Sequence, residues 1–108
     1  MLHRPQHEAA AGLNVVTTLR AQLDAVDARI VAALGERMAL SLGVARVKAE
    51  LGLPQRDSRR EAFILRRARK LARPPLEGRA AEKVLATVLA VTRAAAKAAL
   101  RNRGKHGS

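Results

Sequence analysis

The sequence predicts an all-α protein of three helices, the first of which is long for a chain of 108 residues. Apolar residues recur three or four positions apart in three segments, whereas the alternation typical of a strand never persists. Ala, Leu, Val and Arg are abundant, and all are compatible with helix. The length allows one domain. Phe63 is the only aromatic residue, so the core must be aliphatic.

The first helix is predicted from residue 17 to residue 51. Thr17 or Thr18 can cap its start, and Gly52 followed by Pro54 ends it. Its apolar stripe consists of Leu19, Leu23, Val26, Ile30, Ala33, Leu40, Val44 and Leu51. Such a helix spans about 50 Å, whereas a compact chain of this length has a radius of gyration of about 13 Å. The stripe therefore needs a partner, and a second copy of the chain is the simplest one.

The second helix is predicted to open at Ser58, which forms a capping box with Glu61. The Pro-Pro pair at 74–75 ends it, because proline cannot continue a helix. The third helix runs from near Gly78 to about Leu100.

Three regions follow from this pattern. Residues 1–16 show no clear period and are expected to form a flexible arm, residues 17–100 form the helical domain, and residues 101–108 form a basic tail. No acidic residue follows Glu82, which concentrates positive charge in the last part of the chain.

The net charge of +12 is compatible with three roles: solubility, nucleic-acid binding, or a pocket for a small anion. The scarcity of aromatic residues disfavours nucleic acid, because bases stack on aromatic rings. No run of 18 apolar residues occurs, so no membrane span is predicted. The absence of cysteine excludes disulfides and thiolate zinc sites and fits a cytoplasmic protein.

Charged residues interrupt the apolar stripe of the first helix. Arg37 and Lys48 occupy stripe positions eleven residues apart, so they face the same way and lie roughly 16 Å apart along the helix. Burial of two cations without anions is costly. They either extend along the helix to reach solvent or meet an anionic group.

The other two helices also place polar groups on their apolar sides. Glu61 lies on the stripe of the second helix, Asp57 precedes it by one turn, and Thr92 lies on the stripe of the third. Each of the two acids alone could merely stabilise the helix start. Together, the polar positions predict a lined pocket between helices.

The pocket is predicted to work without a metal or a cofactor. All histidines lie in the two terminal tails, which leaves no ordered histidine cluster for a metal or a nucleophile, and no glycine-rich phosphate loop occurs. Fixed charges remain, and they suit a reaction that needs positioning and electrostatics.

The charged positions resemble the all-α (type II) chorismate mutase family. The similar segments are Leu19-Arg20-x-x-Leu23-Asp24-x-x-Asp27-x-x-Ile30-x-x-x-Leu34-x-Glu36-Arg37, Val44-Ala45-x-x-Lys48 and Pro54-x-x-Asp57-x-x-Arg60-Glu61. The resemblance is close over residues 19–61 and looser over residues 62–97. It implies an intertwined homodimer of three-helix subunits that rearranges chorismate, a dicarboxylate, to prephenate in aromatic amino acid or related secondary metabolite biosynthesis.

The resemblance also implies roles for four cations. Arg20 of one subunit and Arg37 of the other would bind the carboxylates of chorismate. Lys48 would contact a carboxylate and the ether oxygen, and Arg60 would complete the cationic wall. Arg20 and Arg37 are seventeen residues apart and point about 100° away from each other on a regular helix, so one subunit is not expected to direct both into one site.

The same resemblance implies that Glu61, with Asp57 nearby, binds the ring hydroxyl of the substrate. It also matches Thr92 to a residue of the family that carries a small hydroxyl side chain. The family usually has a glutamine one turn later, where this chain has Ala96. If the third helix were shifted in register by one residue, Lys97 would take the place of this glutamine as the donor.

Alternative functions remain open at this point. Related enzymes act on 4-amino-4-deoxychorismate, or on isochorismate as pyruvate lyases, and the absent glutamine is compatible with both. A basic helical nucleic-acid-binding protein is an alternative of another class. A partner enzyme of the same pathway could also complete the activity.

Overall fold

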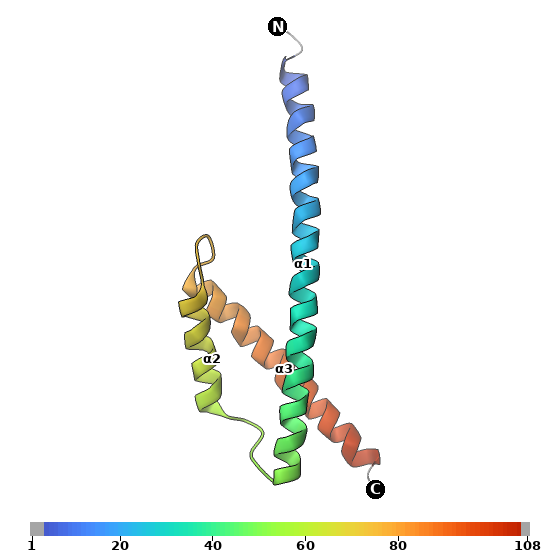
Figure 1. Ribbon diagram of the computed structural model, residues 1–108, viewed down its shortest axis with the longest axis vertical. Coiled ribbons are helices and arrows are strands. Elements are labelled where there is room, and N and C mark those ends of the chain that lie inside the picture. The colour runs from blue at the N-terminus through green and yellow to red at the C-terminus, as the bar shows by residue number, and fades with distance from the viewer. Residues whose placement is uncertain (1–3, 107–108) are drawn as a thin grey trace. The chain divides into compact units, whose positions relative to one another are not determined.

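The computed structural model describes residues 4–106 and contains three α-helices: α1, Arg4–Leu51; α2, Ser58–Leu71; and α3, Gly78–His106 (Figure 1). No strand occurs among these residues, so the predicted all-α class is confirmed. None of the described helices is long and apolar enough to cross a membrane. The chain divides into two units within α1, residues 1–35 and residues 36–108.

Helix α1 starts earlier than the sequence predicted. Residues 4–16, expected as a flexible arm, are helical, while residues 1–3 lie outside the described range. Proline is tolerated in a first helical turn, where an N–H has no helical partner, and the alanines at 9–11 favour helix strongly. The hydroxyls of Thr17 and Thr18, predicted as caps, instead donate to the carbonyls of Leu13 and Asn14 at 2.9 and 3.0 Å.

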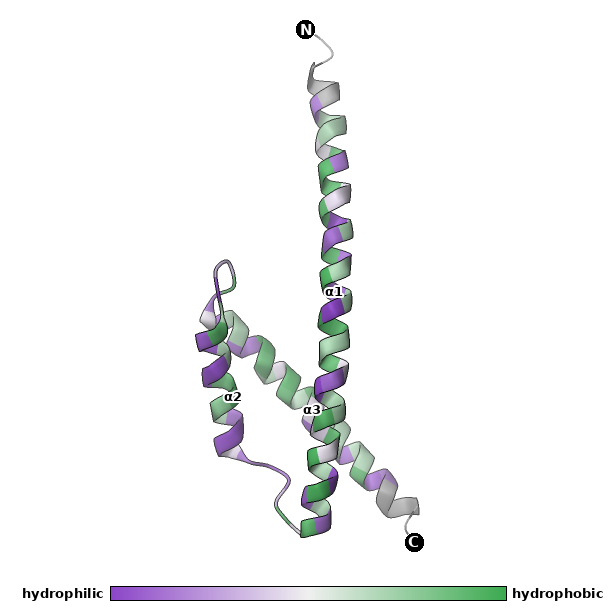
Figure 2. Cartoon of the chain, in the orientation of Figure 1, coloured by the Kyte–Doolittle hydropathy of each residue, from purple (hydrophilic) through white to green (hydrophobic). Residues whose placement is uncertain are grey.

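The apolar stripe of the first unit is uncovered within the single chain. Every residue from 8 to 35 is exposed, including the large apolar residues of the predicted stripe. Figure 2 shows apolar and polar residues following one another along α1. Exposed apolar surface of this extent is typical of an interaction site.

The end of α1 is fixed by a glycine, as predicted. Gly52 has a φ of 69°, in the left-handed region that favours glycine. The N–H of Leu53 donates to the carbonyl of Lys48 at 2.8 Å, and the N–H of Gly52 donates to the carbonyl of Ala49 at 3.3 Å. This pair of bonds is a Schellman motif, which satisfies carbonyls at the helix end.

The start of α2 differs from the prediction by one residue. Asp57, rather than Ser58, is the N-cap, and its Oδ1 accepts a hydrogen bond from the N–H of Arg60 at 3.1 Å. The predicted capping box between Ser58 and Glu61 is therefore wrong. Glu61 lies one position too far along the helix to close such a box, so its carboxylate is available for other contacts.

Helices α2 and α3 pack together near the loop of residues 72–77 and diverge from there (Figure 1). The buried core of the described residues consists of Ala45, Ala68, Ala81 and Leu89, which are 6–8% exposed. At the start of α3, a Cβ on Gly78 would lie 3.3 Å from the carbonyl oxygen of Arg69, so the two helices approach closely. Such a small core contributes little stability by itself.

Helix α3 also exceeds its predicted length. It runs to His106, although we expected it to end near Leu100 and to be followed by a basic tail at residues 101–108. Residues 107–108 lie outside the described range. Alanine-rich sequence up to residue 99 and arginine beyond it both favour helix, which explains the continuation.

We predict that Gly52→Ala lowers the free energy of unfolding by about 1 kcal/mol, because alanine is strained at positive φ. Gly12→Ala is the matched control: Gly12 lies within α1 with open space around it, so alanine should raise the same quantity by about 0.5–1 kcal/mol. Urea denaturation at one protein concentration measures both. Stabilisation by Gly52→Ala would contradict the left-handed cap.

Candidate functional site

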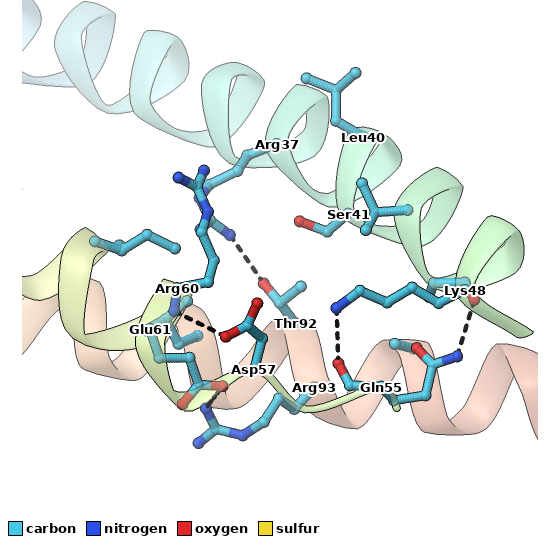
Figure 3. Close-up of a pocket in the computed structure, with 15 residues that line it drawn as sticks. Arg37, Leu40, Ser41, Lys48, Gln55, Asp57, Arg60, Glu61, Thr92 and Arg93 are labelled. Atoms are coloured by element: carbon cyan, nitrogen blue, oxygen red, sulfur yellow. Dashed lines mark hydrogen bonds and ion pairs between the residues drawn. The ribbon is translucent and has the colours of Figure 1, made fainter. Parts of the chain in front are cut away.

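A pocket of about 340 Å³ lies within the second unit, between α1, the start of α2 and α3 (Figure 3). It brings together six of the seven site residues that the sequence predicted. These are Arg37, Lys48, Asp57, Arg60, Glu61 and Thr92. The seventh, Arg20, belongs to the first unit.

Arg37 is held at the rim by a hydroxyl of α3. Its Nη1 donates to Thr92 Oγ1 at 3.4 Å, a long hydrogen bond. Thr92 in turn donates to the carbonyl of Val88 at 2.7 Å, which fixes its hydroxyl as the acceptor for Arg37. The half-buried Arg37 side chain thus keeps most of its five N–H donors for another acceptor.

Lys48 is positioned by the loop between α1 and α2. Its Nζ donates to the carbonyl of Gln55 at 3.1 Å, and the side-chain amide of Gln55 donates to the carbonyl of Ala45 at 2.9 Å. The loop is thereby tied to the last turns of α1. An ammonium group has three donors, so two remain for a ligand.

Glu61 has two cationic partners. Arg93 Nη1 donates to Glu61 Oε2 at 2.8 Å, and Arg56 Nη2 lies 3.6 Å from Glu61 Oε1. Only 20% of the Glu61 side chain is exposed, compared with 42% for Arg93 and 68% for Arg56. Arg93 is the closer and less exposed partner, and it therefore contributes more to holding the carboxylate in place.

Arg60 and Asp57 complete the wall at the start of α2. Asp57 lines the pocket while it caps the helix. The guanidinium of Arg60 lies 5.3 Å from the centre of the Phe63 ring, a cation–π contact that leaves its donors unused.

The electrostatic character of the pocket is cationic. Four cationic and two anionic side chains line it, a formal excess of two positive charges. Within the described part of the chain, no carboxylate lies within 4.0 Å of the charged nitrogens of Arg37, Lys48 or Arg60. A dianion would satisfy these groups, because three sets of unpaired donors converge on one cavity.

The register of α3 agrees with the family pattern described above. Ala96, one turn after Thr92, lines the pocket, whereas Lys97 does not. A one-residue shift that would bring Lys97 into the site is therefore wrong, and a small apolar side chain occupies the position where the family usually has glutamine.

Sequence reasoning missed three polar residues that line the pocket: Ser41, Gln55 and Arg93. Arg93 directly follows Thr92 and lies off the apolar stripe, so only its contact with Glu61 reveals it. Gln55 acts through a backbone carbonyl, which carries no sequence signal.

Comparison with known proteins gives two matches. Residues 19–97 match the family described as chorismate mutase type II. A curated chorismate mutase from Methanocaldococcus jannaschii is 38% identical over 55 residues, which cover 51% of this chain and 56% of that protein. The match thus spans about half the length of that relative. No solved structure matches the chain significantly.

The family match covers most of the chain and extends over all three helices. It also includes every one of the seven predicted site residues, six of which line one pocket. The chain therefore belongs to the type II chorismate mutase family.

Proposed function

We propose that this protein is a chorismate mutase that rearranges chorismate to prephenate in the pocket of the second unit. The observation that carries the proposal is the convergence of Arg37, Lys48 and Arg60 on one cavity without a carboxylate partner among the described residues. Chorismate carries two carboxylates, which match the formal excess of two positive charges. Family membership supports the same substrate.

The reaction is an intramolecular rearrangement that needs no general acid, base or nucleophile. The enolpyruvyl arm must fold over the ring before bonds change, so binding of both carboxylates removes much of the entropic barrier. Arginine suits this task, because its planar fork matches a carboxylate.

Lys48 has the catalytic role in this proposal. Negative charge grows on the ether oxygen as its bond breaks, and a fixed ammonium group stabilises that charge more than it stabilises the substrate. The Gln55 carbonyl holds Nζ from one side and leaves donors free toward the cavity. Glu61, with Asp57 nearby, accepts a hydrogen bond from the ring hydroxyl and thereby orients the ring.

A second copy of the chain would complete the site. The uncovered apolar residues of α1 require a partner, and an intertwined homodimer would bury them. Arg20 of one subunit would then bind a carboxylate in the pocket of the other. A cytoplasmic location and a partner enzyme of the same pathway stay predictions from the sequence.

We predict that Lys48→Ala lowers kcat on chorismate about 10²–10³-fold, the usual effect of losing one donor to the transition state. KM should change much less, because the arginines still bind the carboxylates. Lys70→Ala is the matched control, since Lys70 is exposed on α2 and lies outside the pocket. Steady-state kinetics and thermal melting test both variants. Near-normal kcat with a raised KM would contradict this role, because it would mean that Lys48 binds the substrate and the transition state equally well.

Arg20→Ala and Arg37→Ala should each be nearly inactive, yet an equimolar mixture should regain activity. Half of the mixed dimers would be heterodimers with one intact site, so recovery should approach about a quarter of the wild-type rate. The measurement is prephenate formation after subunit exchange, with the Arg20→Ala/Arg37→Ala double variant mixed with either single variant as control. A monomer mass in light scattering, or no recovery after exchange, would contradict the shared site.

Ala96→Gln should raise kcat on chorismate roughly tenfold, because an amide in this position adds a donor to the pocket wall. Ala98→Gln is the control on the same helix, exposed and outside the pocket. Steady-state kinetics compares the two with the wild type. An unchanged or lower kcat for Ala96→Gln would show that no donor is missing at this position.

A further inference from the structure

Arg93 is the charged residue of the pocket that the proposed reaction leaves without a role. It lies on α3 directly after Thr92, and Figure 3 shows its side chain extending to Glu61 beneath the cavity. Its ion pair with Glu61 is the shortest in the described chain, at 2.8 Å.

Arg93 and Arg56 pair with different oxygens of the Glu61 carboxylate. Arg93 contacts Oε2, and Arg56 approaches Oε1, so each carboxylate oxygen faces one cation. A carboxylate offers about four lone-pair positions. Glu61 can therefore still accept a hydrogen bond from a ligand, but its negative charge is already largely balanced inside the pocket.

A balanced carboxylate distinguishes two kinds of ligand group. A hydroxyl donates a hydrogen bond to it at little electrostatic cost. An ammonium group gains little attraction from a carboxylate that is already paired, and it is repelled by the remaining cations Arg37, Lys48 and Arg60. An unpaired Glu61 would instead attract an ammonium group.

We propose that Arg93 is a specificity-determining residue, which balances the charge of Glu61 so that the pocket selects a ring hydroxyl over a ring ammonium group at the same position. This inference rests on the proposed function for the orientation of the substrate. On this proposal, Arg93 makes the pocket favour chorismate over 4-amino-4-deoxychorismate, although Ala96 stands at the pocket wall.

A purely structural role for Arg93 would have a different signature. The ion pair joins α2 to α3, so its loss could lower stability or impair binding of every ligand alike. Only the specificity role changes the ratio of affinities for two ligands that differ in one group. Arg93→Lys provides a further distinction, since lysine restores the charge without the planar fork.

The experiment uses the full chain with Arg93→Gln, Arg93→Lys and Arg101→Gln. Arg101 is the matched control, because it is exposed on the same helix, lies outside the pocket and removes the same charge. Kd is measured calorimetrically for chorismate and for 4-amino-4-deoxychorismate, and kcat/KM is measured for each. Arg93→Gln should shift both ratios at least about tenfold toward the amino compound, while Arg93→Lys and Arg101→Gln keep the wild-type ratios.

Two results would overturn the inference. The first is that Arg93→Gln keeps the wild-type ratios of Kd and kcat/KM for the two compounds. The second is that Arg101→Gln shifts these ratios as much as Arg93→Gln does, which would assign the effect to net charge. Failure of the proposed function looks different, because the wild type would then bind both compounds without forming prephenate. The ratio of Kd values would still decide the role of Arg93 in that case. Absence of binding of either compound would overturn both proposals.

Discussion

The connection between α1 and α2 controls the geometry of the pocket. It begins with the Schellman motif at Gly52 and ends with the carboxylate of Asp57 on the N–H of Arg60. Between these points, Gln55 bonds to α1 in both directions, as acceptor from Lys48 and as donor to Ala45. Each of these bonds uses a backbone group, so the loop places Lys48 and the first turn of α2 at defined positions around one cavity.

The cap at Asp57 also explains how two neighbouring acids take different tasks. Asp57 satisfies an orphan N–H of α2, and this starts the helix one residue earlier than a capping box at Ser58 would. Glu61 is then free of the helix end and turns its carboxylate to Arg93. A change of one residue in the cap would therefore alter the electrostatics of the cavity as well as the helix boundary.

Helical periodicity predicted some of the residues that share the pocket, whereas Arg60 was assigned through the family resemblance and Gln55 and Arg93 were not predicted. Arg37 and Lys48 stand at stripe positions, and the repeat of the helix brings both to the cavity, together with Glu61 and Thr92 from the other helices. Periodicity indicates on which face of a helix a residue lies, but it does not indicate which group the side chain bonds to. The contact between Arg93 and Glu61, which are 32 residues apart, depends on how two helices pack and has no local signal.

The helix boundaries were harder to predict, for a related physical reason. Residues 4–16 lack an apolar period, yet their helix propensity is sufficient to continue α1. Asp57 and Ser58 are both good N-caps, so local preference alone does not choose between them. Composition thus determined the helical class, and Gly52 determined the end of α1. The start of α1 and the end of α3 depend on helix propensity, which an apolar pattern does not report.

The cations of the pocket, on which the proposed function depends, have a cost in stability. Repulsion among Arg37, Lys48 and Arg60 opposes folding of a unit whose buried core consists of four aliphatic residues in the described chain. Arg93 does not relieve this repulsion, because it adds a further positive charge and balances the negative charge of Glu61. A dianionic ligand removes the repulsion and ties α1, α2 and α3 together, so binding and folding stabilise each other. In the proposed function, the same electrostatic arrangement that makes the empty pocket costly prepares it for a dicarboxylate.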